Sequence, residues 1–206
     1  MIPDELNDSE LLKMALDGEE RAFTALYRRW QKGIFRFAMR ISGSAAIAED
    51  VIQEVFLSLI KGGSGFNPEL GPFSPYIYGI ARNHLLRRMA RERRFAPILE
   101  ESEEDAQARW NAQFVPSDPL GDLTRQEKID SLHRAVAALP LRYREVIVLC
   151  ELQELSYAEA AGVIGCPEGT IRSRLHRARS LLLDKLRDKA EGNAGAPNVE
   201  AARCLL

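Results

Sequence analysis

The chain has 206 residues, which is enough for one domain or two small ones. Hydrophobic residues make up 46% and charged residues 28%, as in an ordinary soluble protein that buries a core. The formal net charge of −2 does not by itself indicate a nucleic-acid partner. There is no signal-peptide pattern, and no apolar run is long enough to cross a membrane, so a secreted or membrane-inserted class is excluded.

The cysteines are few, odd in number and far apart, at Cys150, Cys166 and Cys204. This usage argues for reduced thiols and a cytoplasmic location. The histidines do not cluster with them at metal-ligand spacing, so we predict no metal and no cofactor. The sequence also lacks a nucleophile elbow and a phosphate-binding loop, and we therefore predict no enzymatic activity.

The N-terminal part is predicted to be helical throughout. Residues 9–17 form a short amphipathic helix that ends at Gly18. Apolar residues then recur at helical spacing up to the break at Gly43, and the spacing continues from Ala48 to Leu59. The first part of this pattern comprises Phe23, Leu26, Tyr27, Trp30, Ile34, Phe37, Ala38 and Ile41. These three helices can share one aromatic-rich core.

Residues 62–75 are rich in glycine and proline, so we predict a loop there. A further helix is expected from about Tyr76 into an arginine cluster, because residues 82–94 contain six arginines. Residues 100–105 contain five acids directly afterwards. This separation of charge is more informative than the net charge, and it indicates a nucleic-acid contact.

The C-terminal part is predicted to be a second helical domain. A helix through Leu132 and Leu139 is stopped by Pro140, and residues 141–152 form another. The predicted fold class is therefore all-α, with two small helical domains joined by an acidic, flexible linker. We place the domains at residues 9–95 and 123–190, the linker at 96–122 and a disordered tail at 191–206.

The stretch from Ser156 to Arg179 predicts a helix-turn-helix. Ser156 can cap a short helix, and Gly165, Pro167 and Gly169 mark a tight turn before a second helix. The apolar side of the first helix holds Ala160, Ala161 and Ile164.

The second helix of this motif is expected to enter a DNA major groove. Its inward residues are Ile171 and Leu175, and its outward residues are Arg172, Arg174, Arg177 and Arg179. The alternative is an ordinary helical hairpin with a solvated basic face. The agreement of the small-residue, glycine and isoleucine spacings with the arginines favours DNA binding.

One sector of the helix around residue 50 is polar except for a single leucine. Because successive residues of a helix are rotated by about 100° around its axis, this sector comprises Asp50, Gln53, Glu54 and Leu57. The opposite side holds Ala48, Ile52 and Leu59. Either this is a solvated acidic face with one exposed leucine, or it docks a basic protein partner with Leu57 as an anchor.

The helix after the glycine-rich loop presents a different face. Its residues on roughly one side are Tyr76, Gly79, Asn83, Arg87 and Arg94. An aromatic ring can stack on a base, an asparagine amide can hydrogen-bond it, and arginines can hold phosphates. This combination suits a DNA strand that is opened. The alternative is a core tyrosine beside a solvated basic helix.

Four segments together resemble a bacterial sigma factor of the extracytoplasmic-function type. They are AEDVIQEVF at 48–56, IYGIARN at 77–83, LSYAEAA at 155–161 and GCPEGTIRSRL at 165–175. The likeness spans about residues 10–188. It implies a sigma region 2 domain, a linker and a sigma region 4 domain with no enzymatic activity.

The resemblance also implies partners and sites. Core RNA polymerase is expected at Asp50, Gln53, Glu54 and Leu57. The −10 element of promoter DNA is expected at Tyr76, Asn83, Arg87, Arg88, Arg91 and Arg94, with Asn83 capturing a flipped base. The −35 element is expected at Thr170, Arg172, Ser173, His176 and Arg177. An anti-sigma factor is a further expected partner.

Two departures and two rival functions stand beside this interpretation. Tyr76 occupies a position where tryptophan is frequent in the family, and the loop at 62–72 is unusually rich in glycine. One rival is a stand-alone helix-turn-helix regulator, and the weaker one is an RNA-binding protein that uses the arginine-rich helix. A stand-alone regulator needs neither the acidic docking sector nor a base-capturing helix.

Overall fold

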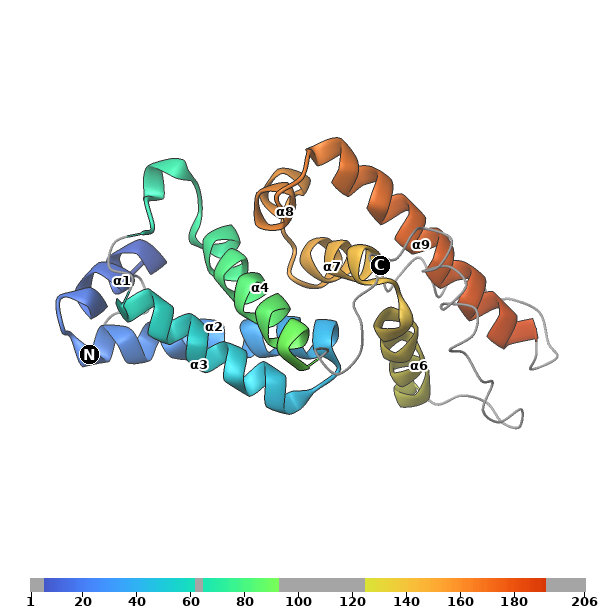
Figure 1. Ribbon diagram of the computed structural model, residues 1–206, viewed down its shortest axis with the longest axis horizontal. Helices are drawn as coiled ribbons and strands as arrows, with labels where there is room; N and C mark the ends of the chain where they lie inside the picture. The colour runs from blue at the N-terminus through green and yellow to red at the C-terminus, as the bar shows by residue number, and fades with distance from the viewer. Residues whose placement is uncertain (1–5, 62–64, 93–124, 192–206) are drawn as a thin grey trace. The chain divides into compact units, whose positions relative to one another are not determined.

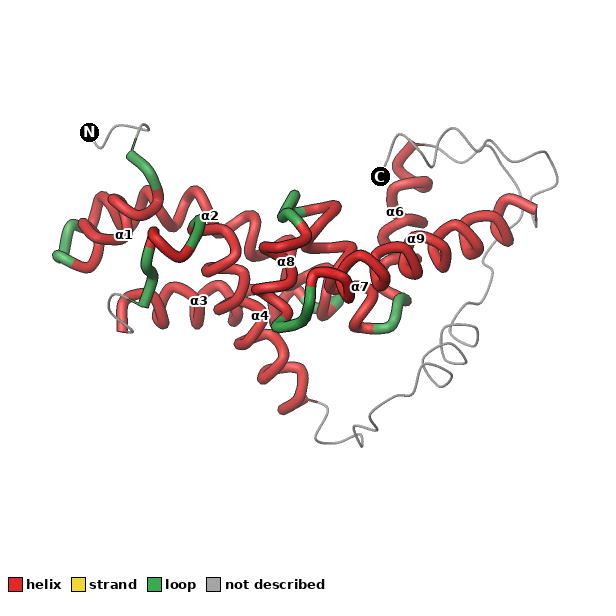
Figure 2. The backbone as a smooth tube through the Cα atoms, turned by 90° about the horizontal axis from the view of Figure 1, so that it is seen from above, coloured by secondary structure: helices red, strands yellow, loops and turns green. Residues whose placement is uncertain are grey.

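The described part of the chain is helical. The computed structural model describes residues 6–61, 65–92 and 125–191. No strand occurs in these three ranges, where helices are joined by short loops (Figure 2). The predicted all-α fold class is confirmed.

The helices fall into two compact units (Figure 1). The first unit contains α1 to α4 and also the segment Leu155–Cys166, which includes α8. The second contains α6, α7, the turn η3 and α9. The predicted linker at 96–122 lies outside the described residues, as does the tail from residue 192, so the predicted domain boundaries stay predictions.

Helix α1 (Asp8–Leu16) begins with a capping box. The side chain of Asn7 accepts from the Glu10 N–H at 2.9 Å, and the Glu10 carboxylate accepts from the Asn7 N–H at 3.0 Å. These two bonds satisfy donors that a helix start leaves without a partner in the helix. Gly18 has φ of 94°, so the helix ends where the sequence predicts.

Helices α2 (Glu20–Ser42) and α3 (Ala45–Lys61) pack against each other as a helical hairpin. Gly43 makes the turn between them with φ of 73°, and its N–H donates to the Met39 carbonyl at 2.8 Å. This left-handed conformation favours glycine, so the predicted break at Gly43 has a backbone cause.

Helix α4 (Phe73–Glu92) begins three residues before the predicted position at Tyr76. The preceding loop also contains a short 3₁₀ turn, η1 (Pro68–Leu70), capped by Asn67. Pro75 therefore lies inside the first turn of α4. Proline is tolerated there because the first four N–H groups of a helix have no partner within it, which is why a proline-based boundary is placed too late.

Aromatic rings join α4 to α2. Trp30 makes edge contacts with Phe73 and Tyr78 at centroid distances of 5.5 and 5.9 Å, and Phe37 meets Tyr78 at 5.5 Å. Burial raises the pKa of Tyr78 to about 12, against the opposing effect of the Arg36 charge. The predicted aromatic-rich core therefore includes α4 as well as the helices before it.

The second unit contains α6 (Arg125–Ala138), α7 (Leu141–Ile147), the π-helical turn η3 (Val148–Leu152) and α9 (Glu168–Glu191). Pro140 separates α6 from α7 as predicted. The predicted helix at 141–152 changes from α-helical to π-helical at Val148. The Val148 carbonyl accepts a hydrogen bond from the Gln153 N–H, five residues later, at 3.0 Å. The largest fully buried side chains here are Leu139, Ile147, Leu149, Ile171 and Leu175.

Helix α8 (Tyr157–Ile164) is fixed at both ends. Ser156 and Glu159 form a capping box, and Gly165 ends the helix with φ of 78° and donates to the Ala161 carbonyl at 2.8 Å. The predicted cap and turn are confirmed. The predicted apolar side is partly wrong, because Val163 is buried and Ile164 is only half-buried.

Cys150 lies half-buried within η3. Burial raises the pKa of its thiol to about 11, the charge of Glu151 raises it further, and the charge of Arg179 opposes both. At neutral pH this thiol is therefore protonated and a weak nucleophile.

Replacing Phe37 by alanine tests the α2–α4 core. Phe37 is fully buried, so we expect Phe37→Ala to reduce the free energy of unfolding of the first unit by about 3–5 kcal/mol. The measurement is urea unfolding followed by Trp30 fluorescence in a Trp110→Phe background. Leu70→Ala is the control, because Leu70 is 87% exposed and its truncation should shift the midpoint little. Equal midpoints for the two variants would contradict this core.

Alkylation of Cys150 tests its protonation state. A rise in pKa from 9.0 to about 11 reduces the thiolate fraction at pH 8 by roughly a hundredfold, so iodoacetamide should react far more slowly with the folded chain than with the urea-unfolded chain. Above pH 9 the unfolded state loses this proton first, so stability should fall as pH rises from 9 towards 11. Peptide mass spectrometry with Cys166 as the internal comparison measures the rates. Equal rates in both states would refute the buried environment.

Candidate functional site

The predicted docking sector of α3 is at the surface. Gln53, Glu54 and Leu57 are exposed and Asp50 is half-buried. The opposite side of the helix is in the core, with Ala48, Ile52 and Leu59 buried. The predicted orientation of the sector is thus confirmed, while its role as a docking surface stays a prediction.

The sector has a second apolar residue that the sequence analysis did not include. Leu57 is 44% exposed, and Ile60, three residues further along the same helix, is 49% exposed. Residues three apart lie side by side on a helix surface. The same helical spacing that selected Leu57 could have found Ile60. Together they form an exposed apolar pair beside the carboxylates of α3.

An ion pair joins the docking sector to α4. Arg88 contacts Asp50 through Nη2 and Oδ2 at 2.6 Å, and its Nε lies 3.6 Å from Glu92 Oε1. Arg88 was predicted to contact DNA, and Asp50 was predicted to contact polymerase. The structure brings these two residues together, so at least one must exchange partners if both predictions hold.

A histidine links the same two helices one turn away. His84 Nδ1 lies 4.0 Å from Glu54 Oε2, and its Nε2 is 2.8 Å from the hydroxyl of Ser58. Glu54 remains exposed in this position, so its carboxylate is open to a partner.

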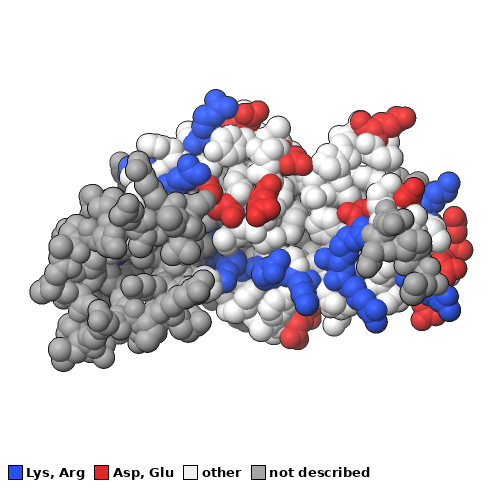
Figure 3. Space-filling view, turned by 180° about the vertical axis from the view of Figure 1, so that it is seen from behind, with Lys and Arg blue, Asp and Glu red and all other residues white. Residues whose placement is uncertain are grey.

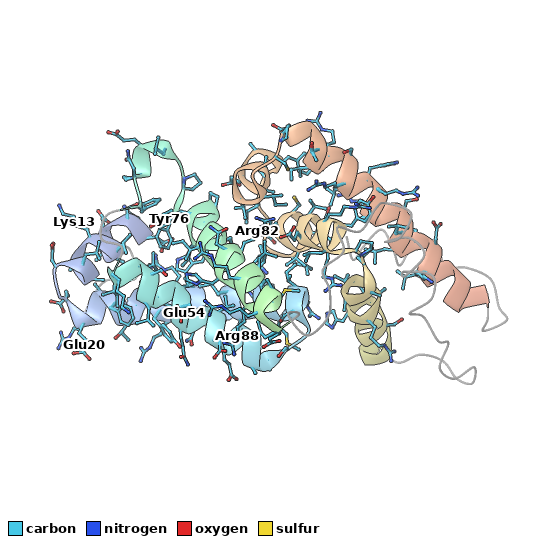
Figure 4. The ribbon with its side chains drawn as sticks, viewed as in Figure 1. Lys13, Glu20, Glu54, Tyr76, Arg82 and Arg88 are labelled. Carbon is cyan, nitrogen blue, oxygen red and sulfur yellow. The ribbon has the colours of Figure 1, made fainter. Side chains whose placement is uncertain are left out.

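The predicted base-capturing face of α4 is partly open. Asn83 and Arg87 are exposed, and a Cβ added at Gly79 would meet no atom within 4 Å. Tyr76 is half-buried, with Phe66 and Phe73 at ring-centroid distances of 5.2 and 5.9 Å. Burial raises the pKa of Tyr76. Tyr76 lies near the start of α4 and Arg88 near its end (Figure 4).

Two further arginines were predicted to bind the −10 element. Arg91 is exposed on the last turn of α4. Arg94 lies outside the described residues.

The first turns of α9 carry the predicted −35 residues. Arg172, Ser173, His176 and Arg177 are exposed, and Thr170 is half-buried. Arg172 pairs with Glu168 at 2.9 Å, and the Ser173 hydroxyl donates to the Thr170 carbonyl at 3.0 Å. Ile171 and Leu175 are buried as predicted, so the helix presents the predicted residues to solvent.

Two arginines of α9 are less exposed than predicted. Arg174 and Arg179 are both half-buried. Arg179 donates from Nη2 to Oε1 of Glu151 in η3. Arg179 points less fully outward than predicted, because its side chain, which stays 42% exposed, reaches the nearly buried carboxylate of Glu151.

Surface charges of both signs are interleaved on the face shown in Figure 3, where Lys and Arg side chains stand beside Asp and Glu side chains. Among the described residues, no three His, Cys, Asp or Glu side chains come together as a metal site would require. The helices searched in the same ranges also include none whose length and hydropathy would suit a transmembrane span.

Two family models match this chain, and each covers one set of predicted sites. The model for sigma-70 region 2 matches residues 26–95, which include the α3 sector and the α4 face. The model for sigma-70 region 4 matches residues 129–182, which include α8 and the first turns of α9.

Individual relatives agree with the family models. The extracytoplasmic-function (ECF) RNA polymerase sigma factor SigM of Mycobacterium tuberculosis is 31% identical over 179 residues, which is 86% of this chain and 84% of that protein. The sigma factor RpoE of Bartonella quintana, solved in complex with the anti-sigma factor NepR, matches at a TM-score of 0.52 and 26% identity, over 76% of this chain and 91% of that one.

A second solved structure shares the fold. CnrH, in complex with the cytosolic domain of CnrY, matches at a TM-score of 0.62 and 24% identity, over 88% of this chain and 97% of that one. The resemblance identified from the sequence motifs is confirmed by these matches. The chain belongs to the sigma-70 family of RNA polymerase sigma factors, in its extracytoplasmic-function group.

Proposed function

We propose that this sigma factor binds core RNA polymerase, directs it to specific promoters and helps to open the DNA for initiation. The observation that carries the proposal is the presence of both sigma regions in one chain, each with most of its described predicted residues exposed. A stand-alone helix-turn-helix regulator would need only the second region. An RNA-binding protein would need neither the α3 sector nor the helix-turn-helix.

The α3 sector is the proposed contact with the polymerase. Exposed Gln53 and Glu54 can hydrogen-bond a basic partner, and Leu57 and Ile60 provide apolar area at the centre of the contact. Interfaces of this kind take most of their affinity from a few desolvated anchors and their specificity from surrounding charges. Asp50 joins this contact when Arg88 leaves it.

The α4 face is the proposed contact with the −10 element. Gly79 leaves room for a base, and Asn83 can donate and accept hydrogen bonds on its edge. Arg87 and Arg91 are placed to hold phosphates on the same helix. Since Tyr76 packs on Phe66 and Phe73, we propose that it supports a stacked base rather than intercalating.

The α9 face is the proposed contact with the −35 element. Arg172, Ser173, His176 and Arg177 occupy the N-terminal turns, the part of a recognition helix that usually meets base edges. Arg172 must exchange Glu168 for DNA, which is easy for an exposed pair on one helix.

The proposal assigns no catalytic role and no cofactor to the chain, because members of this family are transcription initiation factors. It places the protein in the cytoplasm, where its polymerase is. It also includes an anti-sigma factor as a partner, since related sigma factors have been solved in complex with such inhibitors. Run-off transcription with purified core polymerase on genomic fragments tests the whole proposal. Failure to select any promoter would refute it.

Charge reversal on α3 tests the polymerase contact. Glu54→Lys places a cation against a basic partner, so we expect core affinity to fall by about tenfold or more. Equilibrium binding to fluorescently labelled core polymerase measures the change. Glu49→Lys is the matched control, because Glu49 is exposed on the same helix outside the sector. If both variants bind core polymerase as the wild type does, the docking surface is misassigned.

Truncation of Asn83 tests base capture. Asn83→Ala should leave promoter binding in place but cost about 1–3 kcal/mol of discrimination at one −10 position, because one base-edge contact is lost. Permanganate footprinting of open complexes on a −10 library gives the readout. Arg87→Ala provides the contrast, since losing a phosphate contact should weaken all sequences equally and flatten the salt dependence. An unchanged footprint and base preference for Asn83→Ala would argue against capture.

A further inference from the structure

Arg179 differs from the other arginines on α9 in what it contacts. Arg172 and Arg177 are exposed, whereas Arg179 is half-buried and donates from Nη2 to Glu151. Both residues belong to the second unit, where α9 packs along α7 (Figure 1). The pair therefore joins the predicted recognition helix to η3, the turn that follows α7.

Glu151 needs this partner. Its side chain is only 12% exposed, and a carboxylate held so far from water is costly without a cation. It lies within η3, where the Val148–Gln153 bond replaces α-helical spacing with a wider π turn. Such turns are frequent at functional positions because they redirect side chains. Here the turn carries a carboxylate that meets the recognition helix.

Apolar packing sets which side of α9 faces inward, and the ion pair adds a directional contact to it. The helix buries Ile171, Leu175 and Ala178, and contacts of this kind are non-directional. With side-chain tips about 6 Å from the axis, a rotation of about 20° moves them by about 2 Å. Hydrogen bonds to base edges tolerate only a few tenths of an ångström. The Glu151–Arg179 ion pair is directional, because the planar guanidinium group binds a carboxylate in defined geometries.

We propose that the Glu151–Arg179 pair sets the rotation of α9 and thereby positions Arg172, Ser173 and Arg177 on the bases of the −35 element. Arg179 is a positioning residue in this arrangement and makes no base contact. The inference rests on the proposed function, because it assumes that α9 reads promoter DNA.

The alternative role for Arg179 is a direct contact with a DNA phosphate. The two roles predict different effects on DNA binding when Glu151 is replaced by glutamine. An acidic side chain near DNA repels phosphates, so simple electrostatics predicts that Glu151→Gln tightens binding to every sequence. Positioning predicts instead that Glu151→Gln loosens α9 and reduces discrimination between −35 sequences. The carboxylate is therefore the more informative of the two residues to change.

The experiment is a binding selection with the full-length chain and core polymerase, on two promoter libraries, one randomised in the −35 element and one in the −10 element. Glu151→Gln and Arg179→Lys should each reduce discrimination at the −35 positions by about fivefold or more, in the same pattern. Preference at the −10 element and the salt dependence of binding should match the wild type. The charge-swapped double variant, Glu151→Arg with Arg179→Glu, should recover part of the discrimination.

Asp8→Asn and Arg29→Lys are matched controls, because they alter an ion pair of 2.7 Å in the first unit and should leave the −35 preference unchanged. Thermal unfolding of each variant sets an assay temperature at which all are folded. Wild-type −35 preference in folded Glu151→Gln would overturn the inference, as would uniform tightening by Glu151→Gln with a flattened salt slope in Arg179→Lys. A wild-type chain without any −35 preference would instead overturn the proposed function, and this inference with it.

Discussion

The packing of aromatic rings between α2 and α4 is the contact on which the first unit depends. Trp30 and Phe37 of α2 hold Phe73 and Tyr78 of α4, and these contacts fix which side of α4 is inward. The outward side then carries Asn83. Aromatic rings bury large areas with defined edge-to-face geometry, so these contacts set the rotation of α4 about its axis over its first turns. The side of α4 that is proposed to contact DNA is thus a consequence of its core side.

The surfaces proposed for polymerase and for DNA are not independent of each other. Arg88 reaches from α4 to Asp50 on α3, and His84 lies between Glu54 and Ser58. Exposed pairs of this kind are individually weak, so a partner's charges can replace them at little cost. If the polymerase engages Asp50 as proposed, Arg88 becomes available to a phosphate, and polymerase binding would then favour DNA binding.

Much of this arrangement follows from the sequence, and the exceptions have physical reasons. Helical spacing predicted the core of α2 and α3, and glycine and capping residues predicted most helix ends. The start of α4 was predicted too late because Pro75 fits inside a first turn. The position of the Arg179 side chain depends on its contact with Glu151, which lies 28 residues earlier in the chain. Helical spacing carries no information about such a contact.

The exposed apolar pair on α3 also affects how the free chain behaves in water. Leu57 and Ile60 are 44% and 49% exposed, and the free chain can hide them by associating with any other apolar surface, a second copy of itself included. Folding stability does not control this process, since the native state itself presents the pair. The tendency of the free chain to associate therefore depends on how much of it lacks a partner on α3. If the polymerase covers α3 as proposed, the ratio of this chain to the polymerase sets how much of this apolar area is hidden from water.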